Sequence, residues 1–285
     1  MWTNEYQPEK YKFQVLLSVY NAEKHLNQCL KSLDDSLSSY EWILLYGDDE
    51  SSDQSLVELA KCASELTCDK IHLYEFDKAK TVGQAKNRLV KEMHNFKKDY
   101  PYILFMDADD QMLPERPRMA ATAEAENSKY VVGGWERIKK NQQDRFKAQR
   151  TVNNLGYGPW ATLFHADFFT EDEPFFPEDE VCNTGYEDVL TWNHLRYIEK
   201  IEPVPHSSDD PVHRYFVYDE STCHSTDINL LNYRRNTFWG ISDLMKDNQR
   251  NIYTNPVSRK EADEALAAYK ARKSQSKAKN PLSND

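Results

Sequence analysis

The chain has 285 residues, 39% of them hydrophobic and 29% charged, a composition typical of soluble globular proteins and sufficient for one large α/β domain or two smaller ones. Its net charge of -11 argues against a general nucleic-acid binder or a membrane-surface protein, because such proteins usually carry a basic excess. No apolar run approaches the roughly 20 residues of a membrane helix. The polar N-terminus and the five cysteines, which form no CxxC motif, indicate reduced thiols and a cytoplasmic location.

Strand and helix patterns alternate through the first half of the chain. Near-continuous apolar runs predict strands at 12–20, 41–46 and 100–106, the first of them buried on both faces, and "DKIHLYEF" predicts another strand at 69–76. Segments with leucines at helical spacing or with capping residues predict the helices between them, at 21–33, 48–66 and 81–96. This alternation predicts a mostly parallel sheet with right-handed crossovers.

The ends of three predicted strands carry polar residues. They read "SVYN" at 18–21, "YGDDESSD" at 46–53 and "DADD" at 107–110. Ligands of open parallel sheets bind beyond the carboxyl ends of the strands. We therefore expect these three segments to converge on one site.

The second half is less regular. A helix is predicted at 114–126, followed by a strand at 129–138 in which Gly133 and Gly134 mark a bulge or a close backbone approach. A helix is predicted to begin near "GYEDVLTW", and a late strand at 213–222. Beyond residue 256 the chain is polar, with at most one helix at 258–271, and the last dozen residues are expected to be disordered.

Three carboxylates, Asp107, Asp109 and Asp110, follow the fourth strand at once. Two like charges at about 4 Å repel by about 4 kcal/mol at an effective dielectric near 20. Either one carboxylate retains its proton or a cation binds, and carboxylate oxygens suit Mg²⁺ or Mn²⁺. A solvated turn is the alternative and would be preferred for an isolated motif. The buried strand and the neighbouring polar strand ends favour a metal that also binds a diphosphate.

Four segments, in this order, resemble a family-2-type glycosyltransferase with the GT-A fold: "VLLSVYNAEKHLNQCLKSL", "WILLYGDDESSDQS", "VGQAKNRLVKEM" and "YILFMDADDQMLP". Downstream, "GPWATLFHADFF" and "GYEDVLTW" resemble the acceptor-side segments of that family. The resemblance implies a Rossmann-like, mostly parallel sheet flanked by helices. It places the GT-A domain at 11–220, with a nucleotide-sugar half at about 11–115 and an acceptor half at about 116–220. Residues 221–285 are expected to form a helical extension and a polar, partly disordered tail.

The resemblance also implies how the donor is bound. Ser18, Tyr20 and Asn21 are expected under the nucleotide, with Tyr20 against the base. Asp49 is expected to accept a hydrogen bond from the base, which the resemblance implies is uracil. Lys86 is expected near the nucleotide or its phosphates.

For the carboxylates that follow the fourth strand, the resemblance implies that Asp107 contacts the ribose or a metal-bound water and that Asp109 binds Mn²⁺ or Mg²⁺. It makes Asp188 the general base, with Glu187 beside it orienting the acceptor. Trp160 and Trp135 are candidate platforms for the acceptor. His213 and His224 are weaker candidates for a third metal ligand.

Several positions depart from the family pattern. Ser18 replaces the usual proline, and Glu50 stands where glycine is common. Lys86 replaces arginine and so loses bidentate phosphate recognition. No glycine precedes the fourth strand. These departures bear on donor identity more than on fold.

The function implied is metal-dependent, inverting transfer of a sugar from a nucleotide sugar, expected to carry uridine diphosphate, to an acceptor hydroxyl. A nucleotidyltransferase is one alternative, although "SVYNAEKH" lacks the glycine-rich loop typical of that class after the first strand. A non-catalytic nucleotide- or glycan-binding module is another, and Asp188 could instead cap a helix. The acceptor stays open between a glycan, a lipid-linked sugar, a protein and a modified nucleobase.

Overall fold

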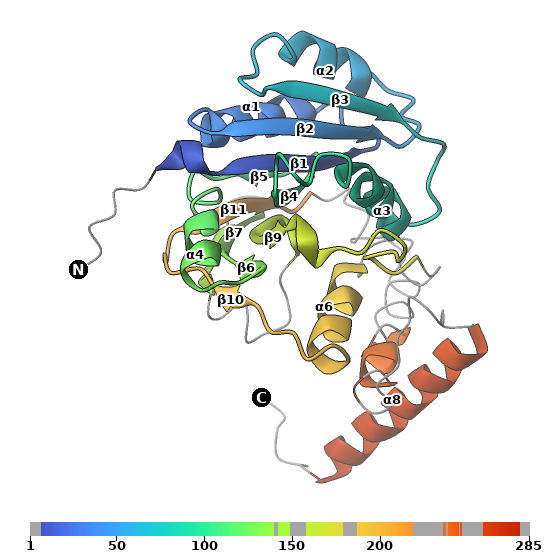
Figure 1. The fold of residues 1–285 in the computed structure, drawn as a ribbon. Coiled ribbons are helices and arrows are strands. Elements are labelled where there is room, and N and C mark those ends of the chain that lie inside the picture. Colours follow the sequence, from blue (N-terminus) through green and yellow to red (C-terminus); the bar gives the residue numbers. More distant parts are fainter. Residues whose placement is uncertain are drawn as a thin grey trace.

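The computed structural model describes residues 7–139, 142–148, 158–178, 187–218, 236–237, 239–244, 246 and 259–279. These residues form two sheets (Figure 1). The large sheet has the order β10-β6-β9-β4-β1-β2-β3. Its strands are β1 (Lys12–Val19), β2 (Glu41–Asp48), β3 (Lys70–Glu75), β4 (Tyr102–Asp107), β6 (Tyr130–Val132), β9 (Thr162–His165) and β10 (Val204–Pro205). The small sheet has the order β5-β11-β7-β8. Its strands are β5 (Gln111–Met112), β7 (Gly134–Lys139), β8 (Gln142–Phe146) and β11 (Pro211–Phe216).

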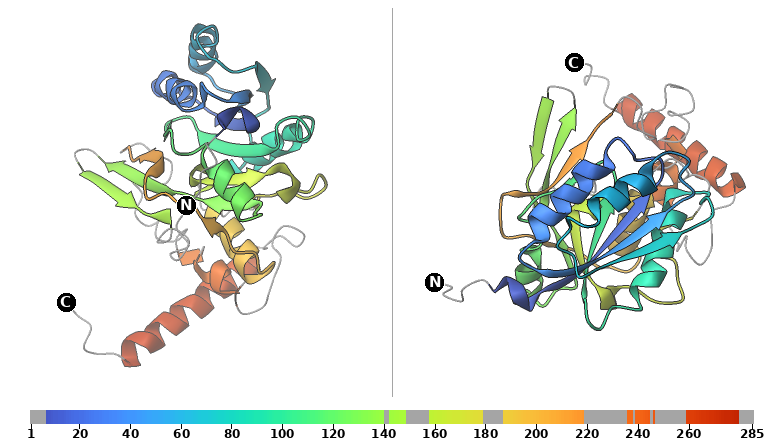
Figure 2. Two further views of the ribbon diagram at one scale, coloured as in Figure 1. Left: turned by 60° about the vertical axis from the view of Figure 1, so that its left-hand side comes forward. Right: turned by 90° about the horizontal axis from the view of Figure 1, so that it is seen from above.

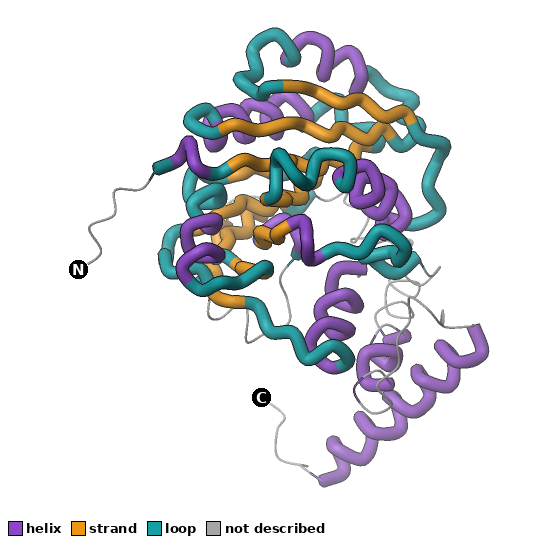
Figure 3. Tube along the Cα trace, in the orientation of Figure 1, coloured by secondary structure: helices purple, strands orange, loops and turns teal. Residues whose placement is uncertain are grey.

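The four strands predicted in the first half pair in parallel, in the order β4-β1-β2-β3. β9 inserts next to β4 and runs antiparallel to both β4 and β6. The predicted α/β fold with a mostly parallel sheet is therefore confirmed. Helices connect the strands (Figure 3). They are α1 (Leu26–Leu37), α2 (Ser55–Cys62), α3 (Val82–Met93), α4 (Met119–Ala125), α6 (Glu187–Tyr197) and α8 (Arg259–Lys279), with short 3-10 turns η1 (Pro8–Lys10), η2 (Pro159–Ala161) and η3 (Ala166–Phe168).

Successive residues of the central strands enter different cores, because side chains alternate between the two faces of a sheet. In β4, Leu104 and Met106 join the core beneath α1, α2 and α4, whereas Ile103 and Phe105 join the core beneath α3 and α6. α1 and α2 cover one face of the large sheet and α3 covers the other (Figure 2). Burial on both faces explains why these strands read as continuous apolar runs.

The predicted strand at 129–138 is divided between the two sheets, which corrects the expectation of a single strand. β6 belongs to the large sheet and β7 to the small one, and the chain crosses between them at Gly133. A Cβ atom on Gly133 would lie 2.4 Å from a methyl group of Val212. Gly133 thus makes room for the Val212 side chain of β11, and the close backbone approach that was one of the two alternatives occurs at Gly134, where a Cβ atom would lie 2.7 Å from the Phe146 carbonyl oxygen.

The bounds of several helices differ from those predicted, most clearly at α4, α2 and α8. Pro114 and Pro117 delay α4 until Met119, because proline is unfavourable inside a helix. α2 begins only at Ser55, where Asp53 Oδ1 accepts the Ser55 N–H at 2.9 Å. α8 continues past Ala271 to Lys279, because the arginine, the lysines, the glutamine and the alanine there favour helix.

α8 lies beyond α6, on the side away from the large sheet (Figure 1). It packs on the helical segment 239–244, where a Cβ on Gly240 would lie 2.6 Å from the Ala265 carbonyl oxygen. Of the last dozen residues, which were expected to be disordered, 274–279 belong to α8 instead, and 280–285 lie outside the described residues. Within the described ranges, no helix combines the length and the apolar character needed to span a membrane.

Candidate active site

The carboxyl ends of β1, β2 and β4 meet at one edge of the large sheet, as predicted. Ser18 pairs in register with Gly47 on one side and with Asp107 on the other. The loops after β1 and β2 are joined, since Asn21 Oδ1 accepts the Ser52 N–H at 2.8 Å. Asn21 adopts a φ of 50°, in the left-handed region that asparagine tolerates better than most residues. Asn21 thus has a structural role at this edge, and its contact with a donor stays a prediction.

The place expected for a nucleobase is bounded by Tyr20 and Asp49. Tyr20 is 51% exposed, and the Lys78 ammonium lies 2.8 Å from the centroid of its ring. The same ammonium is 2.9 Å from Asp49 Oδ2. Asp49 Oδ1 accepts the Ala79 N–H at 2.7 Å and lies 3.3 Å from Arg88 Nη1. Both Asp49 oxygens therefore have partners before any ligand binds.

Lys78 was not singled out from the sequence. It follows the third strand in "EFDKAK", and strand ends of a parallel sheet point to the same edge. The same rule places Lys78 at the edge where the other three polar strand ends were expected to converge.

The three carboxylates after β4 have different surroundings. Asp110 is fully buried: its Oδ1 accepts the Phe216 N–H, and its Oδ2 lies 3.0 Å from His213 Nε2. Burial, reinforced by Asp109 and Asp107, raises the pKa of Asp110 well above its ordinary value. The predicted repulsion is therefore relieved at Asp110 by hydrogen bonds and by a raised pKa, which favours the neutral carboxyl group. His213 contacts Asp110 rather than Asp107 or Asp109, and His224 lies outside the described residues.

Asp109 remains available for a cation. Burial, and then the neighbouring charge of Asp107, raise the pKa of Asp109 to about 6, and it has no ion-pair partner in the described part of the chain. Asp107, at the end of β4, is 31% exposed. No group of three or more His, Cys, Asp or Glu side chains within the described ranges could hold a metal by itself. Asp107 and Asp109 offer carboxylate oxygens, which a hard divalent ion prefers, and oxygens of a bound ligand would have to complete its coordination.

Lys86 bridges two carboxylates instead of standing free for a phosphate. Its Nζ lies 2.8 Å from Glu187 Oε1 and 3.4 Å from Asp107 Oδ1. Lys86 is 5% exposed and Glu187 is 3% exposed. The two carboxylates raise the pKa of Lys86 despite its burial, which acts in the opposite direction as the largest single effect. This ammonium thus joins α3, α6 and the end of β4.

Asp188 is the second residue of α6, directly after Glu187. Its Oδ1 accepts the Val189 N–H at 2.7 Å. Burial, and then the charge of Glu187, raise the pKa of Asp188 to about 7. A carboxylate with a pKa near neutrality is well suited to accept a proton during catalysis.

The two tryptophans proposed as acceptor platforms lie in an aromatic cluster. Trp160 is 8% exposed and stacks on Tyr215, with ring centroids 5.3 Å apart and an interplanar angle of 9°. Trp135 is 9% exposed and stacks on Phe146 at 4.2 Å. Only a small part of either ring reaches solvent, and an acceptor role for them stays a prediction.

Arg116 is a second residue that sequence reasoning missed. It is fully buried, and its Nη2 donates to the carbonyl oxygens of Phe105, Thr162 and Pro159 at 2.7, 3.1 and 3.3 Å. It has no carboxylate partner in the part of the chain that the structure describes. Arg116 therefore holds the backbone near the end of β4 through hydrogen bonds made within the core. Its positive charge also lies close enough to interact with Asp107 and Asp110. The only signal was an arginine between two prolines, which gives no indication of burial.

The sequence profile described as "Glycosyl transferase family 2" matches residues 14–186, which is more than half of the chain. The chain belongs to glycosyl transferase family 2. It is therefore a glycosyltransferase, and the resemblance read from its four ordered segments is confirmed. Membership also supports the transfer of a sugar from a nucleotide sugar.

Solved glycosyltransferase structures share the fold. S. aureus TarS 1-349, in complex with UDP-GlcNAc, is similar with a TM-score of 0.60 and 18% identity over 90% of this chain and 71% of that chain. The mannosyltransferase PcManGT from Pyrobaculum calidifontis, in complex with GDP-Man and Mn²⁺, is similar with a TM-score of 0.57 and 14% identity over 98% of this chain and 78% of that chain. The GT-A-type architecture of this family 2 enzyme is thus shown, and at these identities the likeness concerns the fold alone.

Proposed function

We propose that this enzyme transfers a sugar from a uridine diphosphate sugar to an acceptor hydroxyl, with inversion at the anomeric carbon and with Mn²⁺ or Mg²⁺ as cofactor. The observation that carries the proposal is the convergence of Asp107 and Asp109 with Lys86, Glu187 and Asp188 beyond the carboxyl ends of parallel strands. The complexes of TarS with UDP-GlcNAc and of PcManGT with GDP-Man and Mn²⁺ support a nucleotide-sugar donor and a divalent ion.

The donor half comprises residues of about 11–115. Ser18, Tyr20, Asn21 and Asp49 bind the nucleoside, with Tyr20 against the base and Asp49 accepting a hydrogen bond from it. Asp109, with Asp107, holds the metal ion. When bound, the ion supplies positive charge beside the leaving diphosphate, an effect worth several kcal/mol in comparable enzymes.

The acceptor half comprises residues of about 116–220, and residues 221–285 form an extension. Asp188 removes the proton of the acceptor hydroxyl as that oxygen attacks, a contribution of about 10²–10⁴-fold. A single base on the face opposite the leaving group produces inversion, as in inverting glycosidases. Glu187 forms an ion pair with Lys86 and orients the acceptor. Lys86 also lies beside Asp107, near the place proposed for the donor phosphates.

The experiment is hydrolysis of a panel of nucleotide sugars with Mn²⁺, in the parent enzyme and in Asp109→Ala and Asp188→Asn. We expect hydrolysis of a UDP-sugar by the parent and at least a hundredfold loss in both variants, since one lacks the metal ligand and the other the base. Asp188→Asn should keep the donor affinity, because the donor contacts lie upstream. Donor binding without turnover in the parent would indicate a binding module. Unchanged turnover in Asp188→Asn would mean that Asp188 only stabilises the first turn of α6.

A further inference from the structure

One face of α3 contacts the segment that leads toward α6. Gly83, Lys86 and Asn87 are spaced by three and four residues, so they lie on the same face of the helix. Gly83 and Asn87 contact residues 176–178, and Lys86 contacts Glu187, the first residue of α6. Asp188 follows directly. The contacts of Gly83 and Asn87 involve none of the loops expected to bind the donor.

Asn87 binds the backbone of a single residue through both ends of its amide. Its Oδ1 accepts the Phe176 N–H at 2.9 Å, and its Nδ2 donates to the Phe176 carbonyl oxygen at 2.8 Å. Nδ2 also donates to Glu178 Oε1 at 2.9 Å. Because both polar groups of the Phe176 backbone are satisfied by one side chain, the segment can approach α3 without a neighbouring strand. Asn87 therefore fixes where Phe176 lies on the helix.

Gly83 allows the following residue to come equally close. A Cβ atom at this position would lie 2.1 Å from the Pro177 carbonyl oxygen and 3.3 Å from Phe176 Cβ. A backbone oxygen at 2.1 Å cannot be avoided by turning a side chain, so a methyl group here would push residues 176–177 away from the helix. In an open helix position the same change would be favourable, since alanine is the better helix former.

Phe176 transmits this placement to the core between α3 and α6. Its side chain is fully buried, and the centroid of its ring lies 5.3 Å from that of Phe105 in β4 and 4.9 Å from that of Phe175. The Phe175 ring lies 6.5 Å from Trp192 of α6. The position of the segment and the position of α6 are therefore set by the same face of α3, through the aromatic core and through the Lys86 ion pair.

We propose that Asn87 and Gly83 are positioning residues for catalysis: by docking residues 176–178 on α3 they hold α6, so that Asp188 faces the acidic cluster at the end of β4. This proposal deepens the proposed function and rests on it, because it takes Asp188 as the base. A purely structural role would lower stability and nothing else. A positioning role lowers turnover while the donor affinity stays unchanged.

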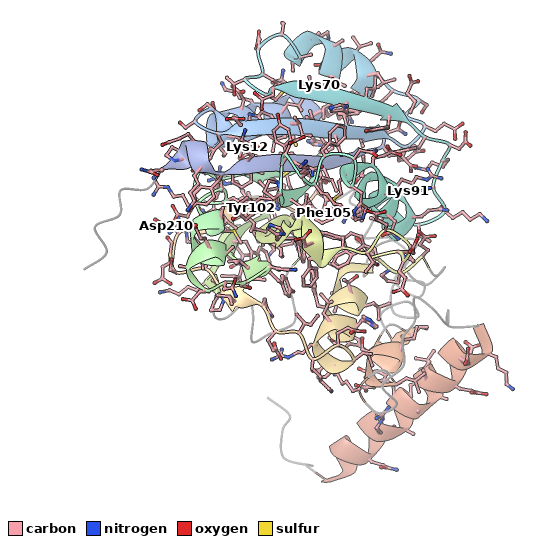
Figure 4. The ribbon with its side chains drawn as sticks, in the orientation of Figure 1. Lys12, Lys70, Lys91, Tyr102, Phe105 and Asp210 are labelled. Carbon is pink, nitrogen blue, oxygen red and sulfur yellow. The ribbon has the colours of Figure 1, made fainter. Side chains whose placement is uncertain are left out.

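The test compares two variants that undock the segment in different ways. Asn87→Ala removes three hydrogen bonds, and Gly83→Ala inserts a methyl group against Pro177. Asn95→Ala is the matched control for the amide, since Asn95 is exposed just after α3. Lys91→Ala is the control on α3, since Lys91 is exposed on that helix (Figure 4). Each variant is measured for UDP affinity with Mn²⁺, for turnover of the donor that the parent hydrolyses, and for hydrogen exchange.

For Asn87→Ala and Gly83→Ala we expect UDP affinity within twofold of the parent, turnover reduced at least tenfold, and faster amide exchange at 170–178 and 187–197. Exchange in β1 and β4 should not change, and both controls should resemble the parent. If Gly83→Ala does not fold, Asn87→Ala alone decides.

Parent-like turnover in the undocking variants, or turnover lost only in proportion to UDP affinity, would overturn the proposal. A failure of the proposed function is recognised separately, by parent-like turnover in Asp188→Asn or by no turnover in the parent. In that case hydrogen exchange decides whether Asn87 and Gly83 hold α6: unchanged exchange at 187–197 would overturn this as well.

Discussion

Lys86 Nζ lies 2.8 Å from Glu187 Oε1, in an ion pair whose side chains are 6% and 4% exposed. The pair joins α3 to α6 across 101 residues of sequence. A buried charge is tolerated in a protein only when it is paired and hydrogen-bonded. The link between the two helices is therefore also a stability element.

The first prediction concerns this pair. Lys86→Met leaves the Glu187 carboxylate buried without its cation, and we expect the free energy of unfolding to fall by about 3–5 kcal/mol. Urea denaturation measures the change. Lys97→Met is the matched control, because Lys97 pairs with Glu171 in an exposed ion pair and should cost less than about 1 kcal/mol. Equal, small effects of the two substitutions would contradict the buried bridge.

The second prediction concerns the pH dependence of Asp188. Its pKa is about 7 in the folded protein and roughly 4 in an unfolded chain, so the folded state binds the proton more tightly. The associated stability is complete below about pH 4 and is lost as the pH rises to about 7. Asn cannot ionise, and Asp188→Asn should therefore raise the free energy of unfolding at pH 8 by roughly 4 kcal/mol, because one pKa unit corresponds to about 1.4 kcal/mol.

Chemical denaturation of parent and Asp188→Asn between pH 4 and pH 8 provides the measurement. The difference should grow through this window and level off above about pH 7. In the parent, turnover should rise through the same window, because only the ionised carboxylate accepts a proton. A constant stability difference across the window would show that Asp188 titrates normally.

The third prediction concerns Lys78. Its ammonium occupies the face of Tyr20 and Asp49 Oδ2, the two partners expected for the nucleobase. Displacing an exposed cation from an aromatic ring requires about 0.5–1 kcal/mol. Lys78→Ala should therefore bind UDP about threefold more tightly, as measured by isothermal titration calorimetry. Lys80→Ala, two residues away and exposed, should leave the affinity unchanged. Weaker UDP binding in Lys78→Ala would mean that the lysine contacts the nucleotide directly.

The sequence predicted the parts of the site that depend on local pattern and topology. "YILFMDADD" locates a buried strand that ends in carboxylates, and parallel strands must bring their ends to one edge. Both expectations are confirmed, because β1 and β4 pair in parallel and their ends lie side by side, with Ser18 opposite Asp107.

Contacts between distant segments could not be predicted in this way. The pairing of Lys86 with Glu187, the docking of Phe176 on Asn87 and the burial of Arg116 depend on how segments far apart in the sequence pack together. The apolar pattern of 129–138 likewise gives no indication that the strand divides between two sheets. Trp160 reads as a possible platform in sequence because its burial is decided by β11, which comes about 50 residues later.

The central claim is that the carboxylates closing β4 hold a divalent cation that binds the donor diphosphate. Calorimetric titration of UDP with and without Mn²⁺, in the parent, in Asp109→Asn and in the exposed control Asp99→Asn, tests it most directly. We predict that Mn²⁺ raises UDP affinity at least tenfold in the parent and in Asp99→Asn and has little effect in Asp109→Asn. The same UDP affinity with and without Mn²⁺ in the parent would contradict the claim.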